Sequence, residues 1–121
     1  MFIVKLTLDA DSNQGQLFLG DTKIGEITVL VRRNALIKYF INIYDNFRNR
    51  GYSKLFDAWL EDKAKELGKE YVIAQWISEW LAQSHEKRGY KIMDEEEERL
   101  FGIASVSNEG PEINMIKRIV T

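Results

Sequence analysis

The stretch Tyr44-Asp-Asn-Phe-Arg-Asn-Arg-Gly-Tyr-Ser-Lys-Leu55 joins a predicted strand to a predicted helix, and it decides how the rest of the sequence is interpreted. The first backbone N–H groups of a helix lack intrahelical partners, and the helix dipole adds partial positive charge there. Gly51 would let an anion approach the backbone closely, and Arg48, Arg50 and Lys54 supply positive charge around it. The stretch therefore predicts an anion site suited to a pyrophosphate. One glycine fits neither the Rossmann nor the P-loop pattern.

Upstream of this stretch, the sequence is rich in β-forming residues and has polar turns. Gly25 lies inside one apolar run and predicts a β-bulge there. Strands are predicted at residues 2–8, 16–19, 24–31 and 35–44, with a loop at residues 9–15 and turns at residues 20–23 and 32–34.

Downstream, the apolar residues change to helical spacing from Ser53, and Gly68 is placed to end that helix. A second helical pattern runs from Ile77 to Arg88 and ends at Gly89. The acidic run at residues 94–98 is interpreted as a solvated turn, and Trp59, Trp76 and Trp80 are predicted to lie in the core. Extended segments are predicted at residues 71–77, 90–93, 100–106 and 113–120, the last two joined as a hairpin by a loop at residues 107–111.

This order of elements predicts a mixed α/β fold, with a mostly antiparallel sheet flanked by helices, in a single domain that spans residues 1–121. The chain is 45% hydrophobic and 30% charged with a formal net charge of −2, so no strong basic field indicates nucleic-acid binding. It has no cysteine and one histidine, which excludes disulfides, thiolate metal sites and a histidine-rich metal site. The short N-terminal apolar run and the lack of a membrane-spanning stretch predict a cytoplasmic location.

Residues 48–53, Arg-Asn-Arg-Gly-Tyr-Ser, resemble the acetyl-coenzyme-A signature of the GNAT superfamily, Gln/Arg-x-x-Gly-x-Gly/Ala. Residues 81–90 are similar to that family's helix-ending segment Ala-x-x-Phe-Tyr-Glu-Lys-x-Gly-Phe. Residues 24–27 and 114–118 resemble its bulged strand and its last strand. These matches occur in the family's order and cover most of the chain from Leu17 onward.

The resemblance implies a GNAT-like fold whose sheet splays near Tyr44, and an N-acetyltransferase that moves an acetyl group from acetyl-coenzyme A to an amine acceptor. Transfer would be direct, without an acyl-enzyme, and the acceptor would be a small molecule or a peptide. No metal is implied. The residues that the resemblance assigns to coenzyme A are Ile41, Asn42, Ile43, Arg48, Asn49, Arg50, Gly51, Tyr52, Ser53 and Lys54.

Two catalytic roles are expected on the same basis. His85 stands where many relatives carry the tyrosine that protonates the departing thiolate, and the unperturbed pKa of histidine suits that task; a packed histidine beside the sheet is the alternative. Glu26 and Glu79 are the candidates for the general base, and both also fit a surface role. A water chain could remove the proton instead.

The sequence departs from the family pattern in ways that keep a second interpretation open. Ser53 stands where the signature has Gly or Ala, and only residues 9–15 are available where relatives carry one or two helices that shape the acceptor pocket. The acceptor site would then be open, or the chain would be a degenerate GNAT-fold binding or interaction protein without turnover. A homodimer formed through the terminal hairpin is a third, weaker hypothesis.

Overall fold

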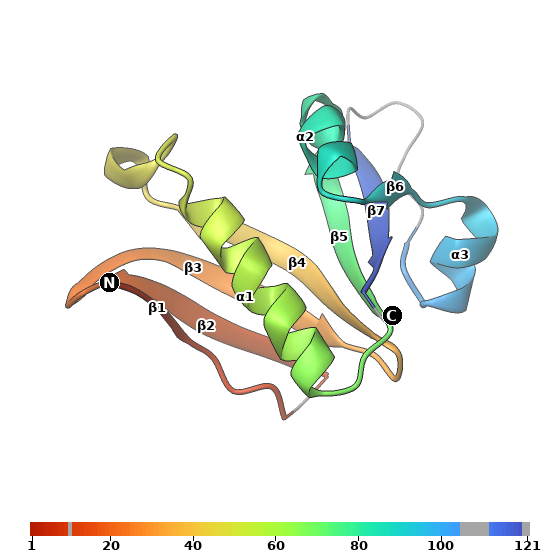
Figure 1. Cartoon of the computed structure of the whole chain (residues 1–121), viewed down its shortest axis with the longest axis horizontal. Helices are drawn as coiled ribbons and strands as arrows, with labels where there is room; N and C mark the ends of the chain where they lie inside the picture. Colours follow the sequence, from red (N-terminus) through yellow and green to blue (C-terminus); the bar gives the residue numbers. More distant parts are fainter. Residues whose placement is uncertain (10, 105–111, 120–121) are drawn as a thin grey trace.

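The computed structural model describes residues 1–9, 11–104 and 112–119. In this part of the chain, seven strands form one sheet in the order β1-β2-β3-β4-β5-β7-β6 (Figure 1). Every pair of neighbouring strands is antiparallel except β4 and β5, which are parallel. The strands are β1 Phe2–Lys5, β2 Ser12–Leu19, β3 Thr22–Val31, β4 Ala35–Ile43, β5 Tyr71–Ser78, β6 Lys91–Ile92 and β7 Glu112–Arg118.

The parallel pair is connected by the longest helix, α1 (Tyr52–Glu66), which crosses one face of the sheet (Figure 1). Two short helices follow later in the chain, α2 (Ala82–Lys87) and α3 (Glu95–Leu100). Two single-turn 3-10 segments, Asp45–Phe47 and Glu79–Leu81, follow the ends of β4 and β5. This mixed α/β arrangement agrees with the fold class predicted from the sequence.

The sheet has a hydrophobic core on each face because successive side chains of a strand point to opposite sides. On one face, Phe56, Leu60 and Ala64 of α1 pack against Leu36, Val72 and other fully buried residues. On the other face, Ile37 and Ile73 pack with Met93, Ile103 and Ile116. Each fully buried aliphatic or aromatic side chain contributes about 1.5–3 kcal/mol, so both cores hold the central strands in place.

The bulge predicted at Gly25 is present. Leu17 pairs with Gly25 while Phe18 pairs with Lys23, so Ile24 is the extra residue in β3. A Cβ on Gly25 would lie 2.4 Å from the carbonyl oxygen of Asn42, which explains why a glycine is required there. No helix in the described residues is long and apolar enough to cross a membrane.

The acidic run is a helix, not the solvated turn that was predicted. Asp94 and Glu97 form a capping box, in which the Asp94 carboxylate accepts from the Glu97 N–H at 2.8 Å and the Glu97 carboxylate accepts from the Asp94 N–H at 3.2 Å. Acidic side chains in the first turn also stabilise the helix, because they interact favourably with the positive end of the helix dipole. The five consecutive acidic residues suggested a solvated turn, but the spacing of Asp94 and Glu97 is that of a capping box and indicates the start of a helix.

Other predictions were wrong in smaller ways. Ser12–Gly15 belongs to β2 although it was expected to be a loop, because it pairs with the end of β3. Leu100 ends α3 and residues 101–104 are not a strand, so the predicted terminal hairpin partner is lost; β7 pairs with β5 and β6 instead. The hairpin loop at residues 107–111 lies outside the described residues. Trp76 and Trp80 are 43% and 79% exposed, whereas Trp59 packs against the core as expected.

Candidate active site

β4 and β5 separate beyond Lys38 (Figure 1), and a cleft lies between the separated parts of the two strands. Among the described residues, pairing between these strands runs from Ala35 with Tyr71 to Lys38 with Ala74 and ends there. Tyr39 is an extra residue in β4 relative to β3, and β5 carries an extra residue at Gln75–Trp76 relative to β7. Because a bulge bends its strand, two bulges at the same level drive the strands apart. The resulting cleft holds about 230 Å³ and is lined by Lys38, Tyr39, Phe40, Ile41, Gln75, Trp76, Ile77, Ser78 and Leu81.

The bulge in β5 is held by a buried side chain on β7. Trp76 has a φ of 55°, which is uncommon for a residue with a side chain. Its backbone N–H donates to Asn114 Oδ1 at 2.8 Å, and Asn114 Nδ2 donates to Glu98 Oε2 at 2.6 Å. Asn114 is 1% exposed. The sequence-based prediction did not include Asn114, although an amide inside the apolar run Ile-Asn-Met-Ile indicates a buried polar side chain with a specific partner.

The separation leaves one edge of β4 unpaired over residues 39–43, where β3 covers only the opposite edge. An unpaired edge presents backbone N–H and C=O groups to an extended ligand. Ile41, Asn42 and Ile43, which the sequence assigned to the cofactor, lie here. Arg48 folds over the end of this strand, donating from Nε to the Ile43 carbonyl at 2.6 Å and from Nη2 to Asn42 Oδ1 at 3.1 Å.

Beyond the cleft, β4 ends beside the N-terminus of α1 (Figure 1), which no side chain caps among the described residues. Asn49 and Gly51 adopt positive φ values of 63° and 82°, and Gly51 is the residue before the helix. A Cβ on Gly51 would meet nothing within 4 Å, so the space in front of this helix end is open. Arg50 and Lys54 are exposed and make no ion pair with the residues that the structure describes. Arg48 pairs with Asp45 at 3.1 Å, so the unpaired positive charge of this loop, among the described residues, lies on Arg50 and Lys54.

A charged cluster lies beneath the cleft, and the sequence reading did not identify it. Asp57 of α1 accepts from Lys38 Nζ through Oδ1 at 2.7 Å and from Arg88 Nη1 through Oδ2 at 2.5 Å. Lys38 and Asp57 are only 6% and 3% exposed. Helical spacing placed Asp57 among the polar residues of the solvent face, but it points inward. A lysine inside the apolar run of β4 was the available signal.

His85 lies next to this cluster and is 4% exposed. Its Nδ1 lies 3.0 Å from the Leu81 carbonyl oxygen, and since a carbonyl only accepts, Nδ1 carries the proton and Nε2 the lone pair. Nε2 is buried and has no hydrogen-bond partner among the described residues. Burial lowers the pKa of His85, and the positive charges of Lys38 and Arg88 act in the same direction. The imidazole is therefore held neutral, in a form that can accept a proton.

Glu26, the proposed base, lies on β3 directly opposite Asn42 of β4. Its carboxylate accepts from Lys23 Nζ at 3.2 Å and from the Tyr44 hydroxyl at 3.1 Å, and these bonds lower the pKa of Glu26. It faces a separate shallow hollow of about 260 Å³. Glu79 is exposed in the turn after β5. The structure thus places neither carboxylate in the lining of the cleft.

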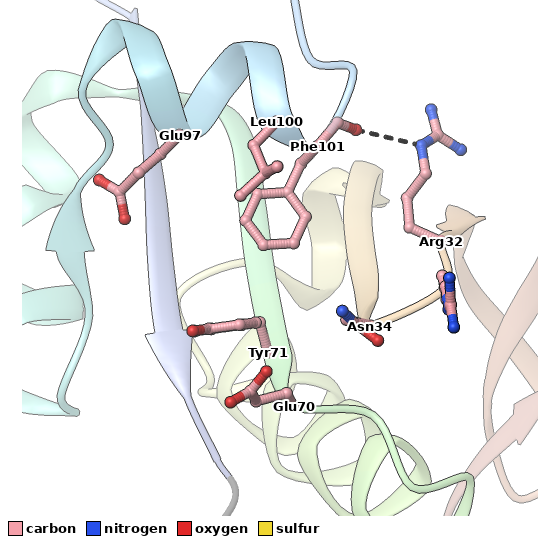
Figure 2. Close-up of a pocket in the computed structure, with 8 residues that line it drawn as sticks. Arg32, Asn34, Glu70, Tyr71, Glu97, Leu100 and Phe101 are labelled. Atoms are coloured by element: carbon pink, nitrogen blue, oxygen red, sulfur yellow. Dashed lines mark hydrogen bonds between the residues drawn. The ribbon is translucent and has the colours of Figure 1, made fainter.

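The largest hollow described is elsewhere, at the other ends of β4 and β5, and holds about 460 Å³ (Figure 2). Figure 2 shows Tyr71 and Phe101 beside it, and Arg32 donating from Nε to the Phe101 carbonyl at 3.3 Å. In sheets with parallel strands, ligands bind at the carboxyl ends of those strands. The cleft beyond Lys38 lies at the carboxyl ends of β4 and β5, so it is the stronger candidate despite its smaller volume.

No family model matches the sequence, and no curated protein matches it. Solved structures do resemble the fold. A Bacillus subtilis acetyltransferase in complex with CoA matches with a TM-score of 0.71 and 13% identity, over 99% of this chain and 100% of that one. Tetrahymena GCN5 matches with a TM-score of 0.68 and 17% identity, over 93% and 71%. The ribosomal-protein-S18-alanine N-acetyltransferase of Escherichia coli matches with a TM-score of 0.68 and 13% identity, over 93% and 72%.

Proposed function

We propose that this chain, which has the fold of the GNAT N-acetyltransferases, moves an acetyl group from acetyl-coenzyme A to an amine acceptor. One observation carries the proposal: β4, which lines the cleft, ends beside the N-terminus of α1 (Figure 1), and no described side chain caps that helix end. An extended arm that ends in a pyrophosphate has the shape and charge that this pair of features requires. The structure of the similar Bacillus subtilis acetyltransferase contains CoA.

In this proposal the pyrophosphate accepts hydrogen bonds from the N–H groups at Tyr52, Ser53 and Lys54. Arg48, Asn49, Arg50 and Gly51 surround it, the arginines contributing charge and the glycine space. The pantetheine arm lies along the free edge of β4 at residues 41–43 and reaches toward the vertex of the cleft near Lys38. Arg48 gives up part of its present contact with Ile43 and Asn42 to meet the phosphates.

The proposed reaction is direct. The acceptor nitrogen attacks the thioester carbonyl, whose oxygen is polarised by backbone N–H groups of the free β4 edge. Glu26 takes up the proton of the amine, directly or through water, and His85 protonates the departing thiolate. The neutral state of His85 makes its role demanding, because Nε2 must first gain a proton.

The acceptor side of the cleft is open and partly aromatic. Tyr39, Phe40 and Trp76 line the cleft and are 41%, 47% and 43% exposed. The Tyr39 and Trp76 rings lie 6.2 Å apart. Such a surface suits an amine presented on a small molecule or a peptide, because aromatic faces attract cations and bury apolar stems.

The cytoplasmic location and the homodimer stay predictions.

Binding of acetyl-coenzyme A is tested by calorimetric titration of the protein with this ligand. Gly51→Glu places a side chain and a negative charge where the pyrophosphate would bind. Gly68→Glu is the matched control, because Gly68 lies at the other end of α1, also has a positive φ of 72°, and also has open space around it. We expect micromolar binding by the wild type and the control, and loss of binding in Gly51→Glu.

Turnover separates the enzyme from the alternative, a GNAT-fold binding protein without activity. Two observations favour this alternative: His85 is neutral, and none of the described residues that line the cleft carries a carboxylate. Release of free thiol is measured with a panel of small amines and peptides. Acetyl-coenzyme A binding without any amine-dependent thiol release would support the binding protein, and no binding by the folded wild type would refute the proposed cofactor.

A further inference from the structure

The charges of the cluster beneath the cleft do not cancel. Lys38 and Arg88 both bond to the single carboxylate of Asp57, which leaves one positive charge in excess. The nearby carboxylate of Glu61 does not neutralise this excess charge, because it forms an ion pair with Lys117 at 2.6 Å. His85 is neutral and Tyr90 is un-ionised, since burial raises the pKa of Tyr90.

Stability alone does not account for this arrangement. Removing ammonium and carboxylate groups from water is costly, and a buried pair contributes little net stabilisation even when its charges balance. Here the buried Lys38–Asp57 pair is balanced, and the excess positive charge comes from Arg88, whose side chain is 26% exposed. The excess charge becomes favourable when an anion comes close to it.

Lys38 is the member of the cluster that reaches the cleft. It is the last residue of β4 that pairs with β5, so it lies at the vertex, and it lines the cleft while Asp57 and Arg88 do not. A pantetheine arm that follows the free β4 edge back from Ile43 toward Tyr39 ends at this vertex. Its sulfur would then lie close to the ammonium group.

We propose that the Lys38 ammonium stabilises the thiolate of coenzyme A electrostatically as it leaves, with Asp57 and Arg88 holding Lys38 in place. This inference rests on the proposed function and assigns a residue to the leaving group. When the amine attacks, the C–S bond breaks and its electron pair goes to sulfur. The thiolate is protonated afterwards, by His85 once its Nε2 has gained a proton or by solvent, the amine proton passes to the base, and Lys38 exchanges no proton. A charged lysine thus does what a proton donor would otherwise do.

The test measures the thiol pKa of coenzyme A bound to the protein, from the ultraviolet absorbance of the thiolate during a pH titration. An opposite charge nearby lowers a pKa by about one to three pH units, from about 8.5 for an ordinary thiol. We expect a lowered value in the wild type and a return toward the ordinary value in Lys38→Met. With an active acceptor, kcat should fall about 10- to 100-fold while KM changes little.

Arg88→Gln is the matched control. It removes the same charge from the same carboxylate, but its side chain does not line the cleft, so the thiol pKa should rise less than in Lys38→Met. Each single variant leaves Asp57 paired with one cation, which avoids an orphaned buried charge. Lys38→Gln repeats the test with a polar side chain if the methionine variant does not fold.

A Lys38→Met or Lys38→Gln protein that binds coenzyme A with the wild-type thiol pKa overturns the inference and leaves the proposed cofactor intact. An Arg88→Gln effect as large as that of Lys38→Met also overturns it, because the charge would then act without contact at the cleft. Failure of the wild type to bind coenzyme A refutes both proposals, and the calorimetric titration identifies that case.

Discussion

Asn114 on β7 accepts the backbone N–H of Trp76 on β5 at 2.8 Å, at the level where β5 separates from β4. The bond compensates a strained backbone, because Trp76 has a φ of 55°. A side chain two strands away from β4 therefore sets the geometry of the cleft. The same amide joins the cleft to α3 through its bond to Glu98.

Asn114→Ala should destabilise the protein by about 1–3 kcal/mol, because it leaves the partly buried N–H of a strained residue without its acceptor. Urea unfolding measures this loss. Asn34→Ala, an exposed asparagine in the β3–β4 turn, should change the free energy of unfolding by less than about 0.5 kcal/mol. Equal stability of the two variants would show that the bond to Trp76 is not needed.

Stability should fall as the pH drops below about 6.5, and the slope should belong to His85. Burial lowers the pKa of His85 in the folded state, so the unfolded state takes up the proton first and is favoured. The stabilisation that comes from keeping His85 neutral is complete above the pKa of His85 in the unfolded state. It is lost as the pH falls toward the lower pKa of His85 in the folded state. His85 is the only histidine in the chain. Urea unfolding between pH 5 and 8 should therefore show a smaller pH dependence in His85→Gln, and an unchanged slope would contradict the assignment.

Asp94→Ala should cost about 0.5–2 kcal/mol, since it removes the N-terminal cap of α3. Glu95→Ala tests the same helix without touching the capping box and should cost less. Amide hydrogen exchange of α3 is the direct readout, because loss of the cap should increase exchange there first. Equal exchange in both variants would mean that the box contributes nothing measurable.

Glu26→Gln tests the proposed base separately from cofactor binding. If Glu26 accepts the amine proton, kcat should fall about 100-fold or more while the affinity for acetyl-coenzyme A is kept. Its hydrogen bonds to Lys23 and Tyr44 lower the pKa of Glu26, so the acidic limb of the rate profile should lie below about pH 4.3. Glu79→Gln is the companion variant and should keep the wild-type rate. The reverse result would move the role to Glu79.

Local sequence patterns were enough to predict much of the fold. The apolar periods predicted α1 and the central strands, Gly25 predicted its bulge, and the Arg-Asn-Arg-Gly segment predicted the position of the loop before α1. The acidic run misled the prediction because its charge obscured the capping spacing of Asp94 and Glu97. Trp76 and Trp80 misled it because periodicity does not show that a face lacks a covering element.

The sequence by itself determined the mixed α/β class and the position of the glycine loop, because both depend on residues that are neighbours along the chain. Only the tertiary structure decided where β4 and β5 part, because that depends on Asn114 meeting Trp76 across 38 residues. It also decided that Lys38, Asp57 and Arg88 meet, since they come from β4, from α1 and from the residue after α2, and no local pattern encodes how these parts pack. His85 is neutral for the same reason: its pKa is set by burial and by charges brought together from distant parts of the chain.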